Sequence, residues 1–265
     1  MKNLVGVIQG RLLPKYKGRY QAHPVGYWKD EFYIAKELGL DCIEFILDYN
    51  NADQNPLLNY DELEKLQRVI LETGVIVKTI CADYFMDAPL HSNNNAVSET
   101  SLKVLKKLLA TSTKLGVSDI VIPCVDKSSL VNSDAVRRFV SQIKKVEAEL
   151  LERDINLSLE TDLDPKSFLS LLDKINSDKV TVNYDIGNSA SLGFDLIEEL
   201  DAYGDRITDI HIKDRKRNSG PVVLGEGDAE FKIFFDKLKE FKYQGPFIMQ
   251  AYRDEEGVEV FKKQL

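Results

Sequence analysis

The stretch INLSLETDLDPKSFLSLLDKINSDKVTVNYDIGN, residues 155–188, decides the fold, because its pattern predicts a strand, a helix and a second strand. Residues 155–160 and 180–185 are short runs rich in aliphatic residues, and each ends in an acidic residue. The segment between them, residues 165–175, has the spacing of an amphipathic helix. A strand, a helix and a strand in this order are typical of one unit of a parallel sheet.

The same unit recurs along the whole chain. Most of the strand-like runs are nearly continuous in apolar character, as expected for strands that are buried on both faces of a parallel sheet. The predicted strands cover residues 4–9, 42–47, 75–81, 120–125, 155–160, 180–185, 207–212 and 246–250. The predicted helices cover residues 28–38, 60–72, 101–115, 133–152, 165–175, 192–203, 229–241 and 255–265.

Eight strand–helix units in 265 residues predict a (β/α)8 TIM barrel, and no linker or change of composition divides the chain. We therefore expect one α/β domain over residues 1–265. A doubly wound open sheet is disfavoured, because residues 10–18 follow the first strand and lack a GxGxxG loop. Glycines just past helices are expected to be left-handed caps, at Gly39, Gly74, Gly116 and Gly245.

Composition excludes several classes of protein and partner. Hydrophobic residues make up 43% of the chain and charged residues 29%, which is typical of a globular protein. The net charge of -8 argues against a nucleic-acid partner. The three cysteines form no CxxC pair, and the apolar N-terminal run is too short for a signal peptide or a membrane span. We expect a cytoplasmic protein with no membrane partner.

Polar residues that end the predicted strands identify a candidate site. Glu160, Asp185 and His211 each close a strand, and the carboxyl ends of neighbouring strands meet at one rim of a barrel. Two carboxylates and an imidazole suit a divalent ion such as Mn, Mg, Co or Zn. A hydrogen-bonded polar cluster without metal is an equally good interpretation of the spacing alone.

Six short motifs occur in order along nearly the whole chain: GVIQGRL (residues 6–12), IEF (43–45), SLET (158–161), YDIGN (184–188), HIKDR (211–215) and LGEGDAEF (224–231). With these motifs the sequence resembles the sugar isomerase and epimerase family with a xylose-isomerase-like TIM barrel, which includes ketose 3-epimerases, hydroxypyruvate isomerase and inosose dehydratase. The resemblance implies metal ligands at Glu160, Asp185, His211 and Gln250. It also implies substrate contacts from Asn188 and Arg217.

Two of these positions depart from the family. The fourth ligand is usually Glu, and Gln250 cannot act as a base. The family has His where this chain has Asn188. With Glu160 as the single base, aldose–ketose isomerisation is favoured over two-base epimerisation, unless Glu44, Asp83 or Asp162 provides the second acid.

Basic residues near the seventh strand predict further contacts. Lys213 is a candidate catalytic electrophile, with a salt bridge to Asp185 as an equal alternative. The basic residues from Lys213 to Arg217 favour an anionic substrate such as a sugar phosphate, although such runs are often simply solvated. Arg11 and Glu44 are assigned to the substrate site, with an ion pair between them as the alternative.

The other polar, cysteine and aromatic residues of interest are expected to have roles outside the chemical step. Asp228 is expected to be a helix N-cap, and Cys81 and Cys124 are expected to be buried and unreactive. His23 and His91 are expected in solvated loops. The aromatic residues near His23, which include Tyr20, Tyr27 and Trp28, are a candidate lid over the substrate.

The leading hypothesis is a metal-dependent isomerase or epimerase of a small sugar, phosphorylated or not, that acts by proton transfer through an enediolate. A sugar dehydratase on the same metal site is the first alternative. A catalytically inactive sugar-binding barrel is the second, because of Gln250 and Asn188. A phosphodiesterase resembling AP endonucleases would need more histidine ligands than the chain offers. A homo-oligomer is compatible with the sequence.

Overall fold

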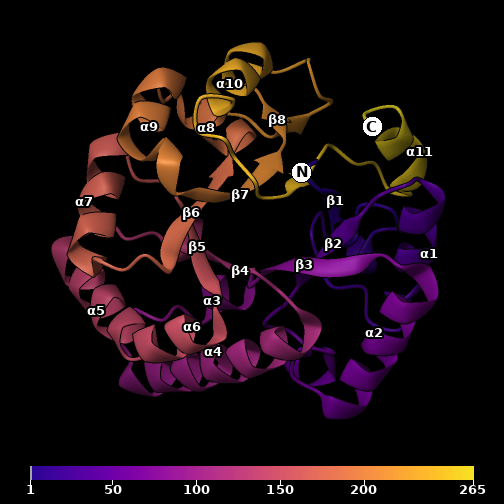
Figure 1. Cartoon of the computed structure of the whole chain (residues 1–265), viewed down its shortest axis with the longest axis horizontal. Coiled ribbons are helices and arrows are strands. Elements are labelled where there is room, and N and C mark those ends of the chain that lie inside the picture. The colour runs from indigo at the N-terminus through magenta and orange to yellow at the C-terminus, as the bar shows by residue number, and fades with distance from the viewer. Residues whose placement is uncertain (1) are drawn as a thin grey trace.

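A computed structural model describes residues 2–265 as a closed barrel of eight parallel strands surrounded by helices (Figure 1). Neighbouring strands follow one another around the barrel in the order β1-β10-β7-β6-β5-β4-β3-β2, and the pair Val5 and Phe247 closes the ring between β1 and β10. The predicted TIM barrel is therefore confirmed. The strands are β1 (Val5–Ile8), β2 (Cys42–Ile46), β3 (Ile76–Cys81), β4 (Asp119–Cys124), β5 (Asn156–Thr161), β6 (Val180–Asp185), β7 (Ile207–Ile212) and β10 (Phe247–Met249).

Helices follow the strands and form the outer layer. A short antiparallel pair, β8 (Asp214–Arg215) and β9 (Pro221–Val222), follows β7. The α-helices are α1 (Asp30–Glu37), α2 (Tyr60–Thr73), α3 (Tyr84–Asp87), α4 (Asn95–Leu115), α5 (Ser133–Lys144), α6 (Glu147–Arg153), α7 (Pro165–Ile175), α8 (Ile186–Leu192), α9 (Leu196–Tyr203), α10 (Phe231–Leu238) and α11 (Val258–Lys262). The 3-10 turns are η1 (Tyr16–Gly18), η2 (Ala52–Gln54), η3 (Asp126–Ser128) and η4 (Gly204–Arg206).

Helix boundaries differ from the prediction where caps intervene. The predicted helix over residues 133–152 is two helices, α5 and α6. Helix α4 begins six residues before the predicted start, because the side chain of Asn94 accepts a hydrogen bond from the backbone N–H of Ala96. Periodicity alone does not show where a polar side chain will satisfy the first free N–H groups of a helix.

The prediction for the glycines is correct at three positions out of four. Gly39, Gly74 and Gly116 have φ values of 72°, 76° and 73°. Gly245 does not take a left-handed conformation. It is required for space instead, since a Cβ there would lie 2.1 Å from the carbonyl oxygen of Thr208.

The barrel interior contains a small apolar cluster contributed by β1, β2, β3 and β10. It consists of Ile8, Cys42, Ile46, Cys81 and Ile248, and all five side chains are buried. A larger apolar shell fills the space between the strands and the helices. Ile248 is the partner of His211 in the register of β10 and β7, so apolar and polar side chains meet in the interior beside the candidate site.

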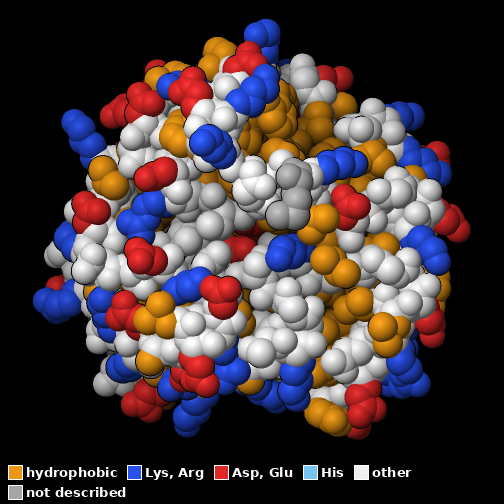
Figure 2. Space-filling model, in the orientation of Figure 1, with side chains coloured by type: hydrophobic (Ala, Val, Ile, Leu, Met, Phe, Trp, Pro, Cys, Tyr) orange, Lys and Arg blue, Asp and Glu red, His pale blue; other side chains and the backbone are white. Residues whose placement is uncertain are grey.

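The three cysteines are free and buried, as predicted for Cys81 and Cys124. On the face drawn in Figure 2, basic and acidic side chains are interspersed. Within residues 2–265, none of the helices combines the length and the apolar character that a membrane crossing needs.

Candidate functional site

Glu160, Asp185 and His211 meet at the carboxyl ends of β5, β6 and β7. Asp185 and His211 are direct partners in the register of β6 and β7, which places their side chains at the same level. One ligand atom from each of the three residues lies within 4.8 Å of the others. The side chains are 8%, 5% and 0% exposed, respectively. The structure thus brings together three of the four predicted metal ligands.

The imidazole of His211 is fixed from below by Glu44. Its Nε2 lies 2.8 Å from Oε1 of Glu44, whose other oxygen accepts a hydrogen bond from Thr79 at 2.8 Å. The Nδ1 atom of His211 is buried without a hydrogen-bond partner among residues 2–265, and it lies 3.9 Å from Oδ2 of Asp185. A histidine held by a carboxylate through one nitrogen, with the other nitrogen free, is typical of a metal ligand.

The electrostatics of His211 agree with this arrangement. Burial lowers its pKa, but the Glu44 carboxylate outweighs burial and raises the pKa to about 10. Without a cation the ring therefore carries a proton on each nitrogen. A metal ion would displace the proton on Nδ1, which is the usual coupling between metal binding and proton release.

Gln250, the fourth predicted ligand, directly follows β10. Its Nε2 donates to Oε1 of Gln21 at 3.0 Å, while its own Oε1 is buried and unpartnered among the described residues. An amide oxygen is an accepted ligand for a hard cation. Two buried polar atoms without partners among residues 2–265, Nδ1 of His211 and Oε1 of Gln250, therefore fit a bound divalent ion.

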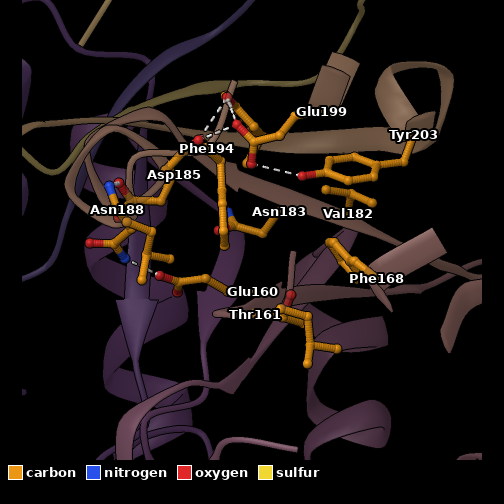
Figure 3. Close-up of a pocket in the computed structure, with 14 residues that line it drawn as sticks. Glu160, Thr161, Phe168, Val182, Asn183, Asp185, Asn188, Phe194, Glu199 and Tyr203 are labelled. Carbon is orange, nitrogen blue, oxygen red and sulfur yellow. Dashed lines mark hydrogen bonds between the residues drawn. The ribbon is translucent and has the colours of Figure 1, made fainter. Parts of the chain in front are cut away.

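Glu160 is held in place by a chain of polar contacts. Asn188 donates from Nδ2 to Oε1 of Glu160 at 2.6 Å (Figure 3). Arg215 in turn donates from Nη1 to Oδ1 of Asn188 at 2.7 Å. Burial, followed by repulsion from Asp185, raises the pKa of Glu160 to about 7. A carboxylate with a pKa near neutrality is suited to general base catalysis.

Asp185 has two structural partners in addition to the cluster. It is the N-cap of α8, since its Oδ1 accepts the backbone N–H of Asn188 at 2.8 Å. Its Oδ2 accepts a hydrogen bond from Nζ of Lys213 at 3.1 Å. The salt-bridge alternative for Lys213 is thus realised, and the ammonium group lies beside the ligand cluster.

A polar cavity of about 310 Å³ opens above these groups. It is large enough for a small sugar. Its wall is formed by the side chains that follow several different strands. The lining residues are Gln21, Asp83, Met86, Pro123, Val125, Asp126, Glu160, Thr161, Asp162, Asn188, Ser191, Leu192, Lys213, Arg215 and Gln250.

Two residues assigned to the substrate have structural contacts instead. Arg11 is buried, and it donates to the carbonyl oxygens of Ala251 and Tyr20, both at 3.1 Å. Glu44 is fully buried beneath His211. The predicted ion pair between Arg11 and Glu44 does not form within residues 2–265, because each side chain has other partners.

Arg217 also lies away from the cavity. It is exposed, and its guanidinium is so close to Gly193 that a Cβ on that glycine would lie 2.7 Å from Cζ. Its backbone N–H donates a hydrogen bond to the carboxylate of Asp228. The prediction that Asp228 is a helix N-cap is wrong, because the N-cap of α10 is Glu230. Arg215 is the arginine that lines the cavity.

The predictions for the loop side chains are wrong at three positions. His23 and His91 are 2% and 7% exposed. His23 contacts Gln9 at 3.0 Å, and burial lowers its pKa to about 3. Trp28 packs edge to face against Phe45 in the core and cannot act as a lid.

Sequence reasoning missed Gln21 and Arg215 as residues of the site. Gln21 lies in the long connection between β1 and α1, where no periodicity indicates the direction of a side chain. A signal was present for Arg215, because it follows His211 and Lys213 at a spacing of two.

The comparisons with known proteins agree with this geometry. Residues 32–265 match the family described as xylose isomerase-like TIM barrel. The chain belongs to this family. It is 28% identical over 244 residues to the L-ribulose-5-phosphate 3-epimerase UlaE of Escherichia coli K12, and the match covers 88% of this chain and 86% of that protein.

Solved structures of low sequence identity have the same fold. The 3-keto-D-glucoside 4-epimerase YcjR of Escherichia coli superimposes with a TM-score of 0.75 at 17% identity, covering 99% of this chain and 97% of that chain. A xylose isomerase-like TIM barrel protein of Mycobacterium smegmatis, solved in complex with magnesium, gives a TM-score of 0.74 at 17% identity, covering 99% and 94%.

Proposed function

We propose that this chain is a divalent-metal-dependent epimerase or isomerase of a ketose or ketose phosphate. The observation that carries the proposal is the unpartnered Nδ1 of His211, which is buried 3.9 Å from Oδ2 of Asp185. His211 and Asp185 form a cluster of potential metal ligands with Glu160, which lines the polar cavity. The similarity to the L-ribulose-5-phosphate 3-epimerase UlaE supports a sugar epimerase in particular.

Glu160, Asp185, His211 and Gln250 would hold the ion. A divalent cation bound there would stabilise the negative charge that develops on a substrate oxygen next to the reacting carbon. The site fits this role, because each of the four residues offers an oxygen or nitrogen atom at the same rim. The single neutral ligand, Gln250, reduces the negative charge of the set compared with a fourth carboxylate.

Glu160 would remove the proton from the carbon next to the carbonyl group. Its oxygen Oε1 accepts the hydrogen bond from Asn188, so the carboxylate is oriented before substrate arrives. Lys213 would contribute positive charge beside the enediolate, because its Nζ lies at the rim next to Asp185. Glu160 is 8% exposed and lines the cavity, so a substrate bound there can reach the base.

The cavity also favours an anionic substrate. Lys213 and Arg215 line it, and Arg215 uses Nε and Nη1 for Ser219 and Asn188, leaving Nη2 for a ligand. Arginine and lysine are the usual partners of phosphate groups. We infer that Arg215, rather than Arg217, contacts the phosphate or a hydroxyl of the substrate.

A sugar-binding barrel without activity is the second candidate, because Gln250 cannot transfer a proton. One experiment separates the two. The purified protein is loaded with Mn²⁺ and incubated with L-ribulose 5-phosphate and with L-ribulose in deuterated water. An active isomerase or epimerase incorporates solvent deuterium at the carbon next to the carbonyl group, whereas binding without exchange supports the inactive barrel.

The variant Glu160→Gln identifies the base in the same assay. We expect it to lower the exchange rate by at least about 100-fold while the protein remains folded, because the amide cannot accept the proton. Folding is checked by thermal unfolding. Exchange at the wild-type rate would reject Glu160 as the base, and loss of water from the sugar, seen as a lower product mass, would indicate a dehydratase.

A further inference from the structure

Epimerisation at one carbon requires a proton to leave from one face and to return from the other. Glu160 provides one proton carrier, and the amide of Gln250 cannot provide the second. An epimerase built on this cavity therefore needs another acid that reaches the substrate.

Three carboxylates besides Glu160 line the cavity, and their positions differ. Asp126 lies in the 3-10 turn η3, beyond the end of β4. Asp162 accepts a hydrogen bond from the hydroxyl of Ser129 at 2.6 Å. Asp83 follows β3 by two residues and contacts Cys81, which belongs to the small apolar cluster of the barrel interior. Asp83 is therefore the carboxylate that is anchored to the barrel interior.

The contacts of Asp83 link it to Gln250. The side-chain amide of Gln21 donates from Nε2 to Oδ2 of Asp83 at 2.9 Å, and Oε1 of Gln21 accepts from Nε2 of Gln250 at 3.0 Å. The thiol of Cys81 lies 3.2 Å from Oδ1 of Asp83. Gln21 thus spans the distance between the neutral residue after β10 and the carboxyl group after β3.

Asp83 and Glu160 line the same cavity from different strands. Their strands, β3 and β5, are separated by β4, whose residue Pro123 also lines the cavity. Two carboxyl groups on different strands can approach a bound ketose from different directions, which a proton transfer between opposite faces of one carbon requires.

We propose that Asp83 is the second proton-transfer residue, which replaces the carboxylate missing at Gln250; this inference rests on the proposed function. In one direction Glu160 takes the proton from carbon, breaking the C–H bond and leaving an enediolate. The carboxylic acid of Asp83 then gives its proton to the opposite face of that carbon, forming the new C–H bond and becoming a carboxylate. Exchange with water returns both groups to their starting states.

The surroundings of Asp83 are compatible with this role. Burial raises its pKa, while the hydrogen bonds from Gln21 and Cys81 lower it. Burial also raises the pKa of Cys81, so the thiol remains a hydrogen-bond donor. The net effect raises the pKa of Asp83, which favours the protonated acid that this step requires.

The test uses the Mn²⁺-loaded full chain with L-ribulose 5-phosphate in deuterated water. Epimer formation and deuterium in the recovered substrate are measured separately. For Asp83→Asn we expect epimer formation to fall by at least about 100-fold, while Glu160 still exchanges the substrate hydrogen. Glu199→Gln, which changes a buried carboxyl group that does not line the cavity and is hydrogen-bonded to Tyr184 and Tyr203, is the matched control and is expected to form the epimer within about threefold of wild type.

The outcomes are distinct. Epimer formation by Asp83→Asn at the wild-type rate, or an equal loss in Glu199→Gln, would overturn the proposal. A wild-type protein that exchanges deuterium but forms only an aldose would overturn it while leaving an isomerase intact. A wild-type protein that does neither refutes the proposed function itself. If Asp83→Asn does not fold, the measurement is made on the wild type alone. Epimer formed at early times is then expected to carry solvent deuterium at the inverted carbon, and epimer without deuterium there would overturn the proposal.

Discussion

Glu44 lies 2.8 Å from Nε2 of His211, so the buried carboxylate determines which imidazole nitrogen faces the rim of the barrel. The two residues come from β2 and β7, on different sides of the barrel. Because Nε2 is occupied, Nδ1 is the nitrogen that remains for a ligand beside Glu160 and Asp185. The effect of Glu44 on the site is therefore indirect, through the orientation and basicity of His211.

Glu44→Gln is expected to weaken binding of Mn²⁺ by about 10- to 100-fold, since outer carboxylates of this kind tune ligand basicity. Calorimetric titration of the metal-free protein with Mn²⁺ measures the change. The matched control is Glu199→Gln, because Glu199 is also a buried carboxyl group but accepts hydrogen bonds from Tyr184 and Tyr203. Equal affinities in wild type and Glu44→Gln would contradict a role of His211 as a metal ligand.

The burial of His23 predicts that the free energy of unfolding decreases at acidic pH. Its pKa falls from an ordinary value of 6.5 to about 3 because the ring is buried. Below pH 6.5 the unfolded chain takes up a proton at this residue and the folded chain does not, so the free energy of unfolding decreases as the pH falls. Between pH 6.5 and pH 4 this loss amounts to about 3 kcal/mol.

The variant His23→Gln removes this titration and keeps a hydrogen-bonding side chain near Gln9. Urea unfolding of both proteins at pH 7 and pH 4 is expected to show a larger loss of unfolding free energy for the wild type. Titration of the other groups is common to the two proteins and cancels in the difference. Parallel losses in wild type and variant would show that His23 is protonated in the folded state.

The sequence predicts the barrel and the convergence of polar side chains at its rim, because both depend on where short apolar runs end. Glu160, Asp185 and His211 converge because parallel neighbouring strands bring their ends together, whatever the loops do. The hydrogen-bond partner of Glu44 cannot be predicted from the positions of the strand ends. Opposite charge suggested Arg11, whereas the structure pairs Glu44 with His211 across the interior.

The parts of the site that come from loops were harder to predict. Gln21 reaches the cavity from a long irregular connection, and its two amide contacts depend on the final path of that loop. Whether Arg215 or Arg217 lines the cavity depends on the short strand pair β8 and β9. Arg215 lies in β8 and lines the cavity, whereas Arg217 lies beyond β8 and does not. Propensity alone gives little information about such short pairs.

The loop after β7 provides a stability prediction that concerns Asp214. Its carboxylate accepts hydrogen bonds from the backbone N–H groups of Gly225, Gly227 and Ala229, at 2.8, 2.9 and 3.1 Å. The backbone of Gly227 lies so close that an added Cβ would be 2.1 Å from Oδ1 of Asp214 and 2.7 Å from the carbonyl oxygen of Arg215. Neither neighbour is the flexible end of a long side chain, so the loop itself must shift.

We therefore expect Gly227→Ala to lower the free energy of unfolding by roughly 1–3 kcal/mol, as overpacked sites usually do. Gly220→Ala is the matched control, because a Cβ at Gly220 meets nothing within 4 Å and is expected to change stability by less than about 0.5 kcal/mol. Urea denaturation of the two variants and the wild type measures the difference. If Gly227→Ala proves as stable as Gly220→Ala, the three backbone hydrogen bonds do not hold Asp214 tightly against this loop.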